Sequence, residues 1–463
     1  MKQDMTTGNP AKTLVVFAIP MILGNLFQQL YSLVDSMIVG QFVGEEALAA
    51  VGACFAVTML FIAVAIGASM GASVIVSQLF GAKRYNEMKK AISTALISFL
   101  VISIVWAAFG MFIRDGLLDL LNTPTNILQD ARTYLGIYFL GIPFMFLYNA
   151  LSSIFNALGD SKTPLGFLIL SSVLNVGLDL WFVIRFQMGV AGVAWATLIA
   201  QGISVVLSFL VLVFRLRRLQ RNLRSELGWD MDIALTEMGT DEKGFYSWPL
   251  LLSMMRVAVP SIIQQSIVSV SMMAVQTLVN DCGSSVVAGY AAAQKIDSVA
   301  IMPMQAVGNA MSTFTAQNIG ANKHERVREG YRASYPMIFL INVAIWMVVR
   351  LGAEPFLGLF LEAGSGSVAM QTGLDYLHLV SMTYFLLGLL MVTGSVLRGS
   401  GDLTWFMINS IMNVVSRIVC AYGLNGILGV SSVWISVPVG WFCGYALHFY
   451  RYRQKKWMEK HLI

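Results

Sequence analysis

Hydrophobic residues run through this sequence in twelve long stretches, and short polar segments separate them. An α-helix rises about 1.5 Å per residue, so roughly 20 apolar residues cross the hydrocarbon core of a bilayer. Each stretch is long enough for one crossing. The pattern predicts an all-α integral membrane protein with twelve transmembrane helices, at about 13–38, 47–77, 92–113, 130–156, 163–185, 189–214, 251–279, 286–317, 331–351, 372–396, 404–425 and 428–450.

The composition supports this interpretation. The 463 residues are 57% hydrophobic and 12% charged, whereas soluble domains carry about 25% charged residues. The polar first twelve residues lead directly into a full-length stretch, so we expect no cleavable signal peptide. The four cysteines stand singly in apolar runs, without metal-site spacing. Motifs for nucleotide binding, zinc proteases and serine hydrolases are missing from the sequence. We therefore expect a transporter driven by an ion gradient, not an enzyme.

Lysine and arginine concentrate in every second loop. Cytoplasmic loops of membrane proteins carry an excess of these residues, so the asymmetry predicts that both termini are cytoplasmic, in a cell membrane. The net charge of +5 sits in these loops and indicates a lipid bilayer as partner, with no nucleic acid. On this assignment the outside keeps only Arg114, Arg132, Arg185 and Arg350.

The second half of the sequence repeats the first. Six spans per half is an even number, so the halves are parallel repeats, typical of transporters that rock around a central cavity. We predict an N-lobe (1–215), a cytoplasmic linker (216–247), a C-lobe (248–450) and a basic cytoplasmic tail (451–463). The matching landmarks are Ala18-Ile19-Pro20 with Ala258-Val259-Pro260, Gln78 to Ala82 with Gln317 to Ala321, Gly159-Asp160 with Gly401-Asp402, Asn175-Val176 with Asn413-Val414, and Gly192-Val193 with Gly429-Val430.

Two carboxylates lie inside predicted spans of the first half. Asp35 and Asp179 are each about six residues from the outer end of their spans. Asn175 shares a helix face with Asp179, and Thr197 falls at the same depth on the sixth span. A charge inside a membrane helix costs several kcal/mol, roughly 2.5–3.5 on insertion scales, which favours an ion site. Carboxylate, amide and hydroxyl oxygens suit Na⁺ or an exchangeable proton; a polar network that only joins helices is the alternative.

Further polar residues could complete this site or form a second one. Gln28, Tyr134 and Asn149 could add to the shell of the first site. In the second half, Val275 replaces Asp35 and Arg417 replaces Asp179. Lys295 and Asp297 on the eighth span, with Arg417, could form a charge-compensated network. Whether this network contacts substrate stays open.

Several motifs, taken together, resemble the multidrug and toxic compound extrusion (MATE) family in its bacterial branches. The motifs are AIPMILGNLFQQLYSLVDSMIVG, AAVG, QLFGAKR, NALGDSKTP and GVAGVAWAT in the first half, and QNIGANK and RGSGD in the second. The resemblance covers essentially the whole chain.

The resemblance implies a two-lobe transporter that exports small cationic, often aromatic compounds in exchange for H⁺ or Na⁺, without an organic cofactor. It places the first-lobe ion site at Asp35, Asn175, Asp179 and Thr197, where Na⁺ would also bind. Gln28, Tyr134 and Asn149 match neighbouring positions of its cavity.

Two other functions remain open at this point. The runner-up is a flippase for a lipid-linked saccharide or another lipid-borne anion, from the same superfamily. Such a protein would need a cavity dominated by Arg and Lys, whereas the first half here is acidic. A channel or a membrane-embedded enzyme is supported only by the buried charges. We expect the protein to act as a monomer.

Overall fold

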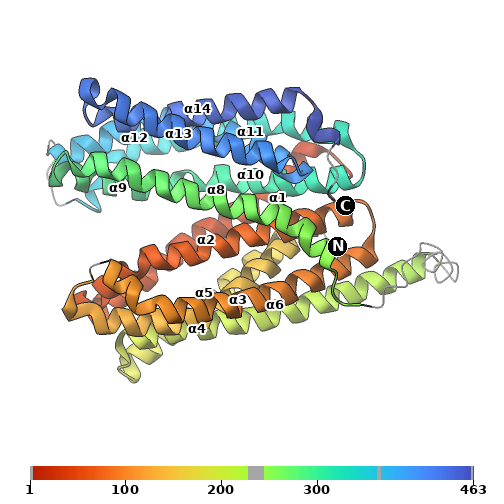
Figure 1. Cartoon of the computed structure of the whole chain (residues 1–463), viewed down its shortest axis with the longest axis horizontal. Helices are drawn as coiled ribbons and strands as arrows, with labels where there is room; N and C mark the ends of the chain where they lie inside the picture. Colours follow the sequence, from red (N-terminus) through yellow and green to blue (C-terminus); the bar gives the residue numbers. More distant parts are fainter. Residues whose placement is uncertain (1–3, 122, 228–243, 362–366, 460–461, 463) are drawn as a thin grey trace. The chain divides into compact units, whose positions relative to one another are not determined.

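The computed structural model describes residues 4–121, 123–227, 244–361, 367–459 and 462. Almost all of these residues are helical, and none of them forms a strand. The α-helices are α1 (Pro10–Ile38), α2 (Glu45–Gly81), α3 (Tyr85–Leu120), α4 (Thr125–Ala157), α5 (Lys162–Leu180), α6 (Gly189–Leu227), α8 (Trp248–Asn280), α9 (Ser284–Ala300), α10 (Met302–Gly320), α11 (His324–Gly358), α12 (Val368–Ser400), α13 (Leu403–Leu428) and α14 (Ser431–Arg453), as labelled in Figure 1.

Every predicted stretch is helical, which confirms the all-α fold class. Ten helices in the described part of the chain are long and apolar enough to cross a membrane by themselves. The chain is therefore a multi-pass membrane protein. Two short π-helical turns, Val39–Val43 and Trp181–Arg185, extend α1 and α5 at one end.

The stretch predicted at 286–317 as one helix is in fact two. α9 ends at Ala300 and α10 begins at Met302, with Ile301 between them. Pro303 explains the break, because proline has no N–H to donate to the preceding turn and fits the first positions of a helix. The two helices together cover the predicted span.

The chain divides into two compact units. Unit 1 contains Phe27–Ala258, and unit 2 contains Met5–Leu26 with Val259–Ile463. This partition differs from the predicted lobes at two places. The first part of α1 packs with unit 2, and the first part of α8 packs with unit 1. The division of the chain into an N-lobe and a C-lobe that act as functional units stays a prediction.

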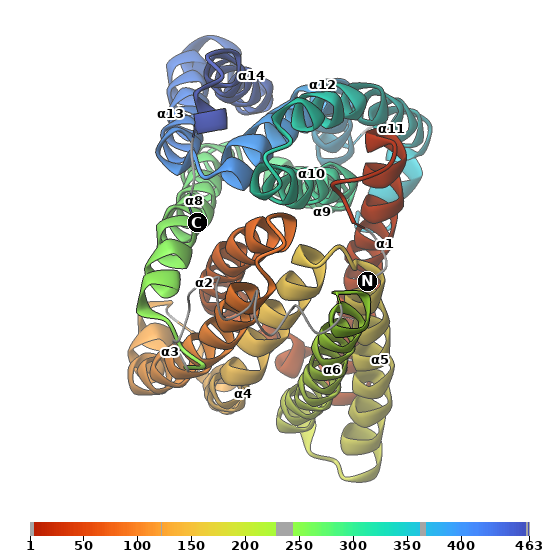
Figure 2. The same ribbon diagram turned by 90° about the vertical axis from the view of Figure 1, so that its right-hand side faces the viewer.

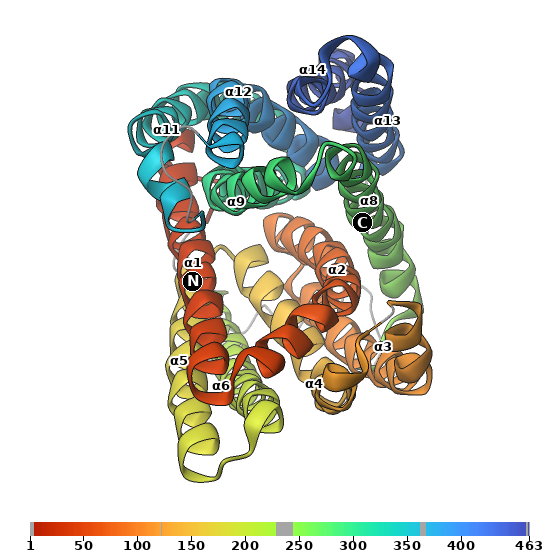
Figure 3. The same ribbon diagram turned by 90° about the vertical axis from the view of Figure 1, so that its left-hand side faces the viewer.

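Each unit is organised around its fourth span. In unit 1, α4 packs against α2, α3 and α6, and α5 packs against α6. In unit 2, α12 packs against α10, α11 and α14, and α13 packs against α14. Figures 2 and 3 show both arrangements. The two units therefore repeat one helix order, as the sequence landmarks predicted.

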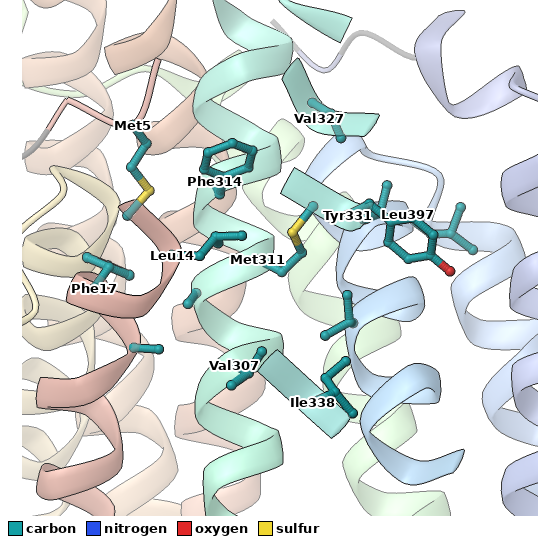
Figure 4. Packing of buried hydrophobic residues seen from close by; sticks show 14 of the residues in the cluster. Met5, Leu14, Phe17, Val307, Met311, Phe314, Val327, Tyr331, Ile338 and Leu397 are labelled. Carbon is teal, nitrogen blue, oxygen red and sulfur yellow. The ribbon is translucent and has the colours of Figure 1, made fainter. Parts of the chain in front are cut away.

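The core of unit 2 includes residues from the start of the chain. Met5, Leu14 and Phe17 are buried together with Met311 and Phe314 of α10 (Figure 4). A membrane is an apolar solvent, so close packing rather than removal from water stabilises such contacts within the bilayer.

The predicted linker and tail are partly helical. α6 continues to Leu227, which places the first twelve residues of the predicted linker in a helix. Residues 228–243 lie outside the described residues. After α14, a short 3₁₀-helix (Lys456–Glu459) brings Trp457 into the core of unit 2. The described part of the tail, up to residue 459, is therefore packed on unit 2 rather than extended.

Candidate functional site

Three helices bring the four predicted ion-site residues together within unit 1. Asp35 comes from α1, Asn175 and Asp179 from α5, and Thr197 from α6. Asn175 and Asp179 lie one turn apart, on the buried face of α5. Asp179 is 0% exposed and Asn175 is 2% exposed, so neither depends on water for its hydrogen bonds.

The amide of Asn175 is the centre of this cluster. One orientation of the amide gives each of its groups a partner. Its nitrogen then donates to Asp179 Oδ2 at 2.8 Å and to the hydroxyl of Tyr31 at 2.9 Å. Its oxygen accepts from Thr197 Oγ1 at 3.1 Å and from the Thr197 backbone N–H at 2.9 Å. The cluster thus joins α5 to both α1 and α6.

The carboxyl groups of Asp35 and Asp179 lie within hydrogen-bonding reach of each other. A hydrogen bond between them requires a proton on the pair, because two ionised carboxylates offer only acceptors. Asp35 Oδ1 and Asp179 Oδ1 are buried and have no hydrogen-bond partner among the described residues. These two oxygens could accept a second proton or face a cation.

The same geometry tests the fit of Na⁺. The cluster offers hard oxygens of the type that Na⁺ prefers, and the two unpartnered carboxyl oxygens could serve as ligands. However, the Asn175 oxygen already accepts two hydrogen bonds from Thr197. Na⁺ would also compete with a hydrogen bond between the two carboxyl groups, which only a proton can form. In this arrangement the residues fit a proton better than Na⁺.

Tyr31 was missed by the sequence analysis. It lies four residues before Asp35 on α1, and the i, i+4 spacing puts both side chains on one helix face. Its hydroxyl accepts from Asn175, so it belongs to the cluster. That spacing was a usable signal.

The three predicted shell residues differ in position. Tyr134 stacks on Tyr138, with ring centroids 6.4 Å apart. Both rings and Thr197 line a cavity of about 30 Å³ between α4 and α6, so Tyr134 faces the space beside the ion cluster. Asn149 donates instead to Met145 O of its own helix at 2.9 Å. Gln28 is exposed and has no hydrogen bond to the cluster in the described structure.

In unit 2 the predicted charged residues separate into two places. Asp297 is buried, and it accepts hydrogen bonds from Tyr384 at 2.5 Å and from Tyr376 at 3.3 Å. Arg417 interacts electrostatically with Asp297 and is hydrogen-bonded to Tyr290. Lys295, in contrast, is exposed, and its Nζ lies 5.1 Å from the ring centre of Phe360.

The network in unit 2 is therefore a carboxylate, an arginine and tyrosines, and Lys295 is not part of it. Aromatic packing holds it in place, because Tyr290 stacks on Trp434 at 5.3 Å and Tyr376 meets Trp434 edge-on at 5.3 Å. An acidic group and a basic group compensate each other here. In unit 1 two acidic groups lie beside each other instead.

Comparison with known proteins supports a transporter family. The MatE family model matches residues 20–181 and 260–423. A protein named "Probable multidrug resistance protein YoeA", from Bacillus subtilis (strain 168), is 30% identical over 461 residues, which cover 97% of this chain and 95% of the relative. A protein named "FAD transporter", from Shewanella oneidensis, is 23% identical over 75% of this chain and 74% of its own.

A solved structure shows the same fold. It is described as an outward-facing conformation of a multidrug resistance MATE family transporter of the MOP superfamily. It matches with a TM-score of 0.85 at 24% identity, covering 99% of this chain and 98% of the other.

Proposed function

Because this chain belongs to the MatE family, whose members are membrane transporters and not enzymes, we propose that it exports small organic cations in exchange for protons. The contact between the Asp35 and Asp179 carboxyl groups is the observation that carries this proposal. A carboxyl pair that shares one proton has one negative charge, so it attracts a cation. Binding of a second proton removes that charge.

The exchange follows from this change in charge. With one proton on the pair, the site and an organic cation are complementary. With two protons the site is neutral, and a cation loses its electrostatic attraction. Asn175 and Tyr31 hold Asp179 in position while its protonation changes. Thr197 also lines the small cavity beside Tyr134 and Tyr138, which is the size of a water site and would have to open before an organic cation could enter it.

The proposal includes the setting of the protein. We place it in the cell membrane with both termini in the cytoplasm, on the basis of the lysine and arginine asymmetry of its loops. It would act as a monomer and need no organic cofactor. The proton is then the coupling ion, and Na⁺ is the alternative that the test below separates from it.

A transport assay tests the coupling. Purified protein in liposomes should move a fluorescent organic cation when a pH gradient is imposed, and it should not do so with a Na⁺ gradient at constant pH. Transport driven only by Na⁺ would overturn proton coupling but leave antiport in place. Facilitated movement with neither gradient would overturn antiport.

Arg417 favours a second candidate substrate class. It stands where the first repeat has Asp179, and its buried Nε has no hydrogen-bond partner among the described residues. A relative is named an FAD transporter, and FAD is an anion with aromatic rings. Export of an organic or lipid-borne anion is therefore the alternative. Competition by FAD but not by the cationic dye in the same liposomes would favour it.

A further inference from the structure

The segment before α1 is held by side chains from the turn between α10 and α11. The four side chains Gln317, Asn318, Lys323 and Arg326 surround the backbone of residues 5–8, all within unit 2. We call these four residues the N-terminal clasp. They belong to the sequence QNIGANKHER, whose first part was a repeat landmark and has no role in the proposed ion site.

The clasp binds backbone groups rather than side chains. Arg326 donates to three carbonyls, those of Met5 at 3.0 Å, Gly8 at 2.6 Å and Thr7. Lys323 Nζ donates to Thr6 O at 2.8 Å. Four successive carbonyl groups thus accept hydrogen bonds from two cationic side chains. Hydrogen bonds from charged donors are stronger than those between neutral groups.

Neutral side chains complete the clasp. Met5 N–H donates to Gln317 Oε1 at 3.1 Å, and Asn318 Nδ2 donates to Met5 O at 3.1 Å. The side chain of Met5 is 0% exposed and packs beside Phe314 (Figure 4). The Arg326 guanidinium lies 5.4 Å from the Phe314 ring centre, which fixes its direction. The segment is therefore held along its backbone and at one buried side chain.

The equivalent turn in unit 1 is built differently. The repeat pairs Gln317 with Gln78 and places Glu87 where unit 2 has Arg326. There Arg84 donates to Glu87 at 2.6 Å, so the cation of that turn is engaged locally. The segment before α8 is held instead on α3, where the Ser247 N–H donates to Thr94 at 3.0 Å. The clasp is a feature of unit 2 and is not a general property of the repeat.

The position of α1 gives the clasp a consequence for transport. α1 begins in unit 2, changes units between Leu26 and Phe27, and carries Asp35 in its unit 1 part. One continuous helix therefore connects the clasp to the carboxyl pair. If the start of α1 is fixed, a movement of Asp35 toward or away from Asp179 must either deform α1 or displace the part of unit 2 that holds its start.

We propose that the N-terminal clasp positions α1 so that the protonation of Asp35 is transmitted to unit 2. This inference rests on the proposed exchange of protons for cations. The clasp residues touch neither substrate nor proton, so they are positioning residues that act through α1. Loss of the clasp should leave the binding of substrate intact and weaken the link between proton binding and transport.

A pair of neighbouring arginines provides the matched test. Arg326→Gln removes the fork that holds three carbonyls. Arg328→Gln is the control, because Arg328 is on the same helix, and the bonds that the structure gives its guanidinium run to Glu325, at 2.7 and 2.9 Å, and to Tyr452, outside residues 5–8. Arg326→Lys keeps the charge without the fork and should give an intermediate result. Each variant is first checked for wild-type melting temperature and monodispersity in detergent.

The first readout is independent of transport. Hydrogen exchange of the peptide that covers residues 5–8 should become about tenfold faster or more in Arg326→Gln, because a segment whose carbonyls are no longer held opens more often and exposes its amides, including the Met5 N–H bonded to Gln317. Arg328→Gln should exchange at the wild-type rate. Equal exchange in Arg326→Gln and wild type would overturn the clasp itself, whatever the protein transports.

The second readout separates positioning from a merely structural role. In Arg326→Gln we expect an unchanged dissociation constant for the cationic dye and an unchanged pH dependence of binding. The maximal rate of transport should fall about tenfold, and the number of protons moved per dye should fall as well. Arg328→Gln should keep both. If the segment opens but rate and proton ratio stay at wild-type values, the positioning role is wrong.

Failure of the proposed function would look different. Wild-type protein would then show no dye movement driven by a pH gradient, while the difference in hydrogen exchange between the two arginine variants persists.

A purely structural role of the clasp would give another result. If the number of protons moved per dye in Arg326→Gln is unchanged and only its melting temperature falls, the clasp is a stability element and the inference is overturned.

Discussion

At the scale of single residues, the two halves differ most clearly at one equivalent position of the repeat, which is Asp179 in the first half and Arg417 in the second. Asp179 of unit 1 lies beside the carboxyl group of Asp35, whereas Arg417 of unit 2 interacts with the carboxylate of Asp297. A carboxyl pair can bind and release a proton, but an arginine keeps its charge at every physiological pH. The two sites therefore differ in chemistry, and we propose the first as the site of proton exchange.

Asp35→Asn should uncouple the protein without unfolding it. Asparagine is close in size to aspartate and can still hydrogen-bond to Asp179, but it cannot exchange a proton near neutral pH. We expect dye movement driven by a pH gradient in liposomes to be lost, with unchanged melting temperature in detergent. Transport by Asp35→Asn at the wild-type rate and with the wild-type proton ratio would contradict the proposed role.

A second prediction concerns an ion pair outside the membrane-spanning segments. Asp160 is 4% exposed in the turn between α4 and α5, and it pairs with Arg215 of α6. It also accepts from the backbone of Lys162 at 3.1 Å and of Thr163 at 3.2 Å. Burial raises the pKa of Asp160, but the hydrogen bonds from Arg215 and Thr163 outweigh it and hold the pKa below its usual value.

The pH dependence of this pair has a definite sign. A carboxyl whose folded pKa is lowered stabilises the protein above its unfolded pKa, about 3.9, and loses that contribution as pH falls through the folded pKa. Asp160→Asn should destabilise unit 1 by about 2 kcal/mol at pH 7, below the usual cost of breaking a buried pair because Arg215 is 30% exposed.

Thermal unfolding in detergent checks this prediction. The melting difference between wild type and Asp160→Asn should be full at pH 7 and shrink only below about pH 4. Asp115→Asn is the control, since Asp115 pairs with Arg132 at 2.9 Å on an exposed surface and should leave melting unchanged. A difference that stays constant down to pH 3 would show that the lost charge is not the cause.

At the scale of helices, close approach of backbones determines the packing within each unit. Gly399 on α12 faces α10 so closely that a Cβ would lie 2.5 Å from Ser312 O and 2.9 Å from Thr315 Cβ. Small residues allow such contact, which is how helices associate where lipid is as apolar as the side chains. The motif RGSGD therefore has a packing role in unit 2.

Gly399→Ala and Gly423→Ala should have opposite effects. The first forces α12 away from α10 and should destabilise the protein by about 1–3 kcal/mol, as overpacking does. Gly423 on α13 has nothing within 4 Å of its Cβ position, and alanine there should stabilise the helix by roughly 0.5–1 kcal/mol. Melting temperatures in detergent compare the two. A gain in stability for Gly399→Ala would contradict the packing role.

Helix geometry explains which parts of this arrangement the sequence could predict. The rise per residue is fixed, so counting from the span ends predicted one depth for Asp35, Asn175, Asp179 and Thr197, and the structure brings these four residues together. The direction in which a side chain points around the helix axis was not considered for Lys295 and Asp297. Lys295 and Asp297 are two residues apart, about 200° around the helix, so they cannot face one cluster. That signal was present in the sequence.

Other features could not be derived from the sequence. The contact between the Asp35 and Asp179 carboxyl groups depends on the crossing of α1 and α5, which spacing along each helix does not specify. The N-terminal clasp joins Met5 to Gln317, residues 312 positions apart. Contacts at such separation come from packing of whole units, and no local pattern around Met5 indicates them. The break before Met302, in contrast, was signalled by Pro303.

At the scale of the whole molecule, orientation in the membrane is a prediction that labelling can test. In a background with the exposed Cys282 replaced by serine, cysteine at Glu45 should react with an impermeant thiol reagent from outside intact cells. Cysteine at Lys162 should react only after the membrane is opened. Both positions are exposed in unit 1. The reverse pattern would overturn the assignment of cytoplasmic termini.

The exchange itself makes a quantitative prediction. If cation and proton compete at the carboxyl pair, each must weaken the binding of the other by the same factor. Substrate affinity should then fall as pH is lowered through the titration of the pair. The slope of log Kd against pH must equal the number of protons released per cation bound, since both express one linkage.

Both quantities can be measured on the same detergent-solubilised protein. Titration calorimetry with the cationic dye at several pH values gives the slope, and a pH indicator in weak buffer gives the protons released. In Asp179→Asn the one remaining carboxyl group can still exchange a single proton, so slope and release should stay equal while the pH range in which affinity changes is displaced. A slope that differs from the release, or an unchanged pH range in Asp179→Asn, would mean that the proton acts at another site. The cation would then be coupled to the proton only through a change of conformation, and not through competition for one charge.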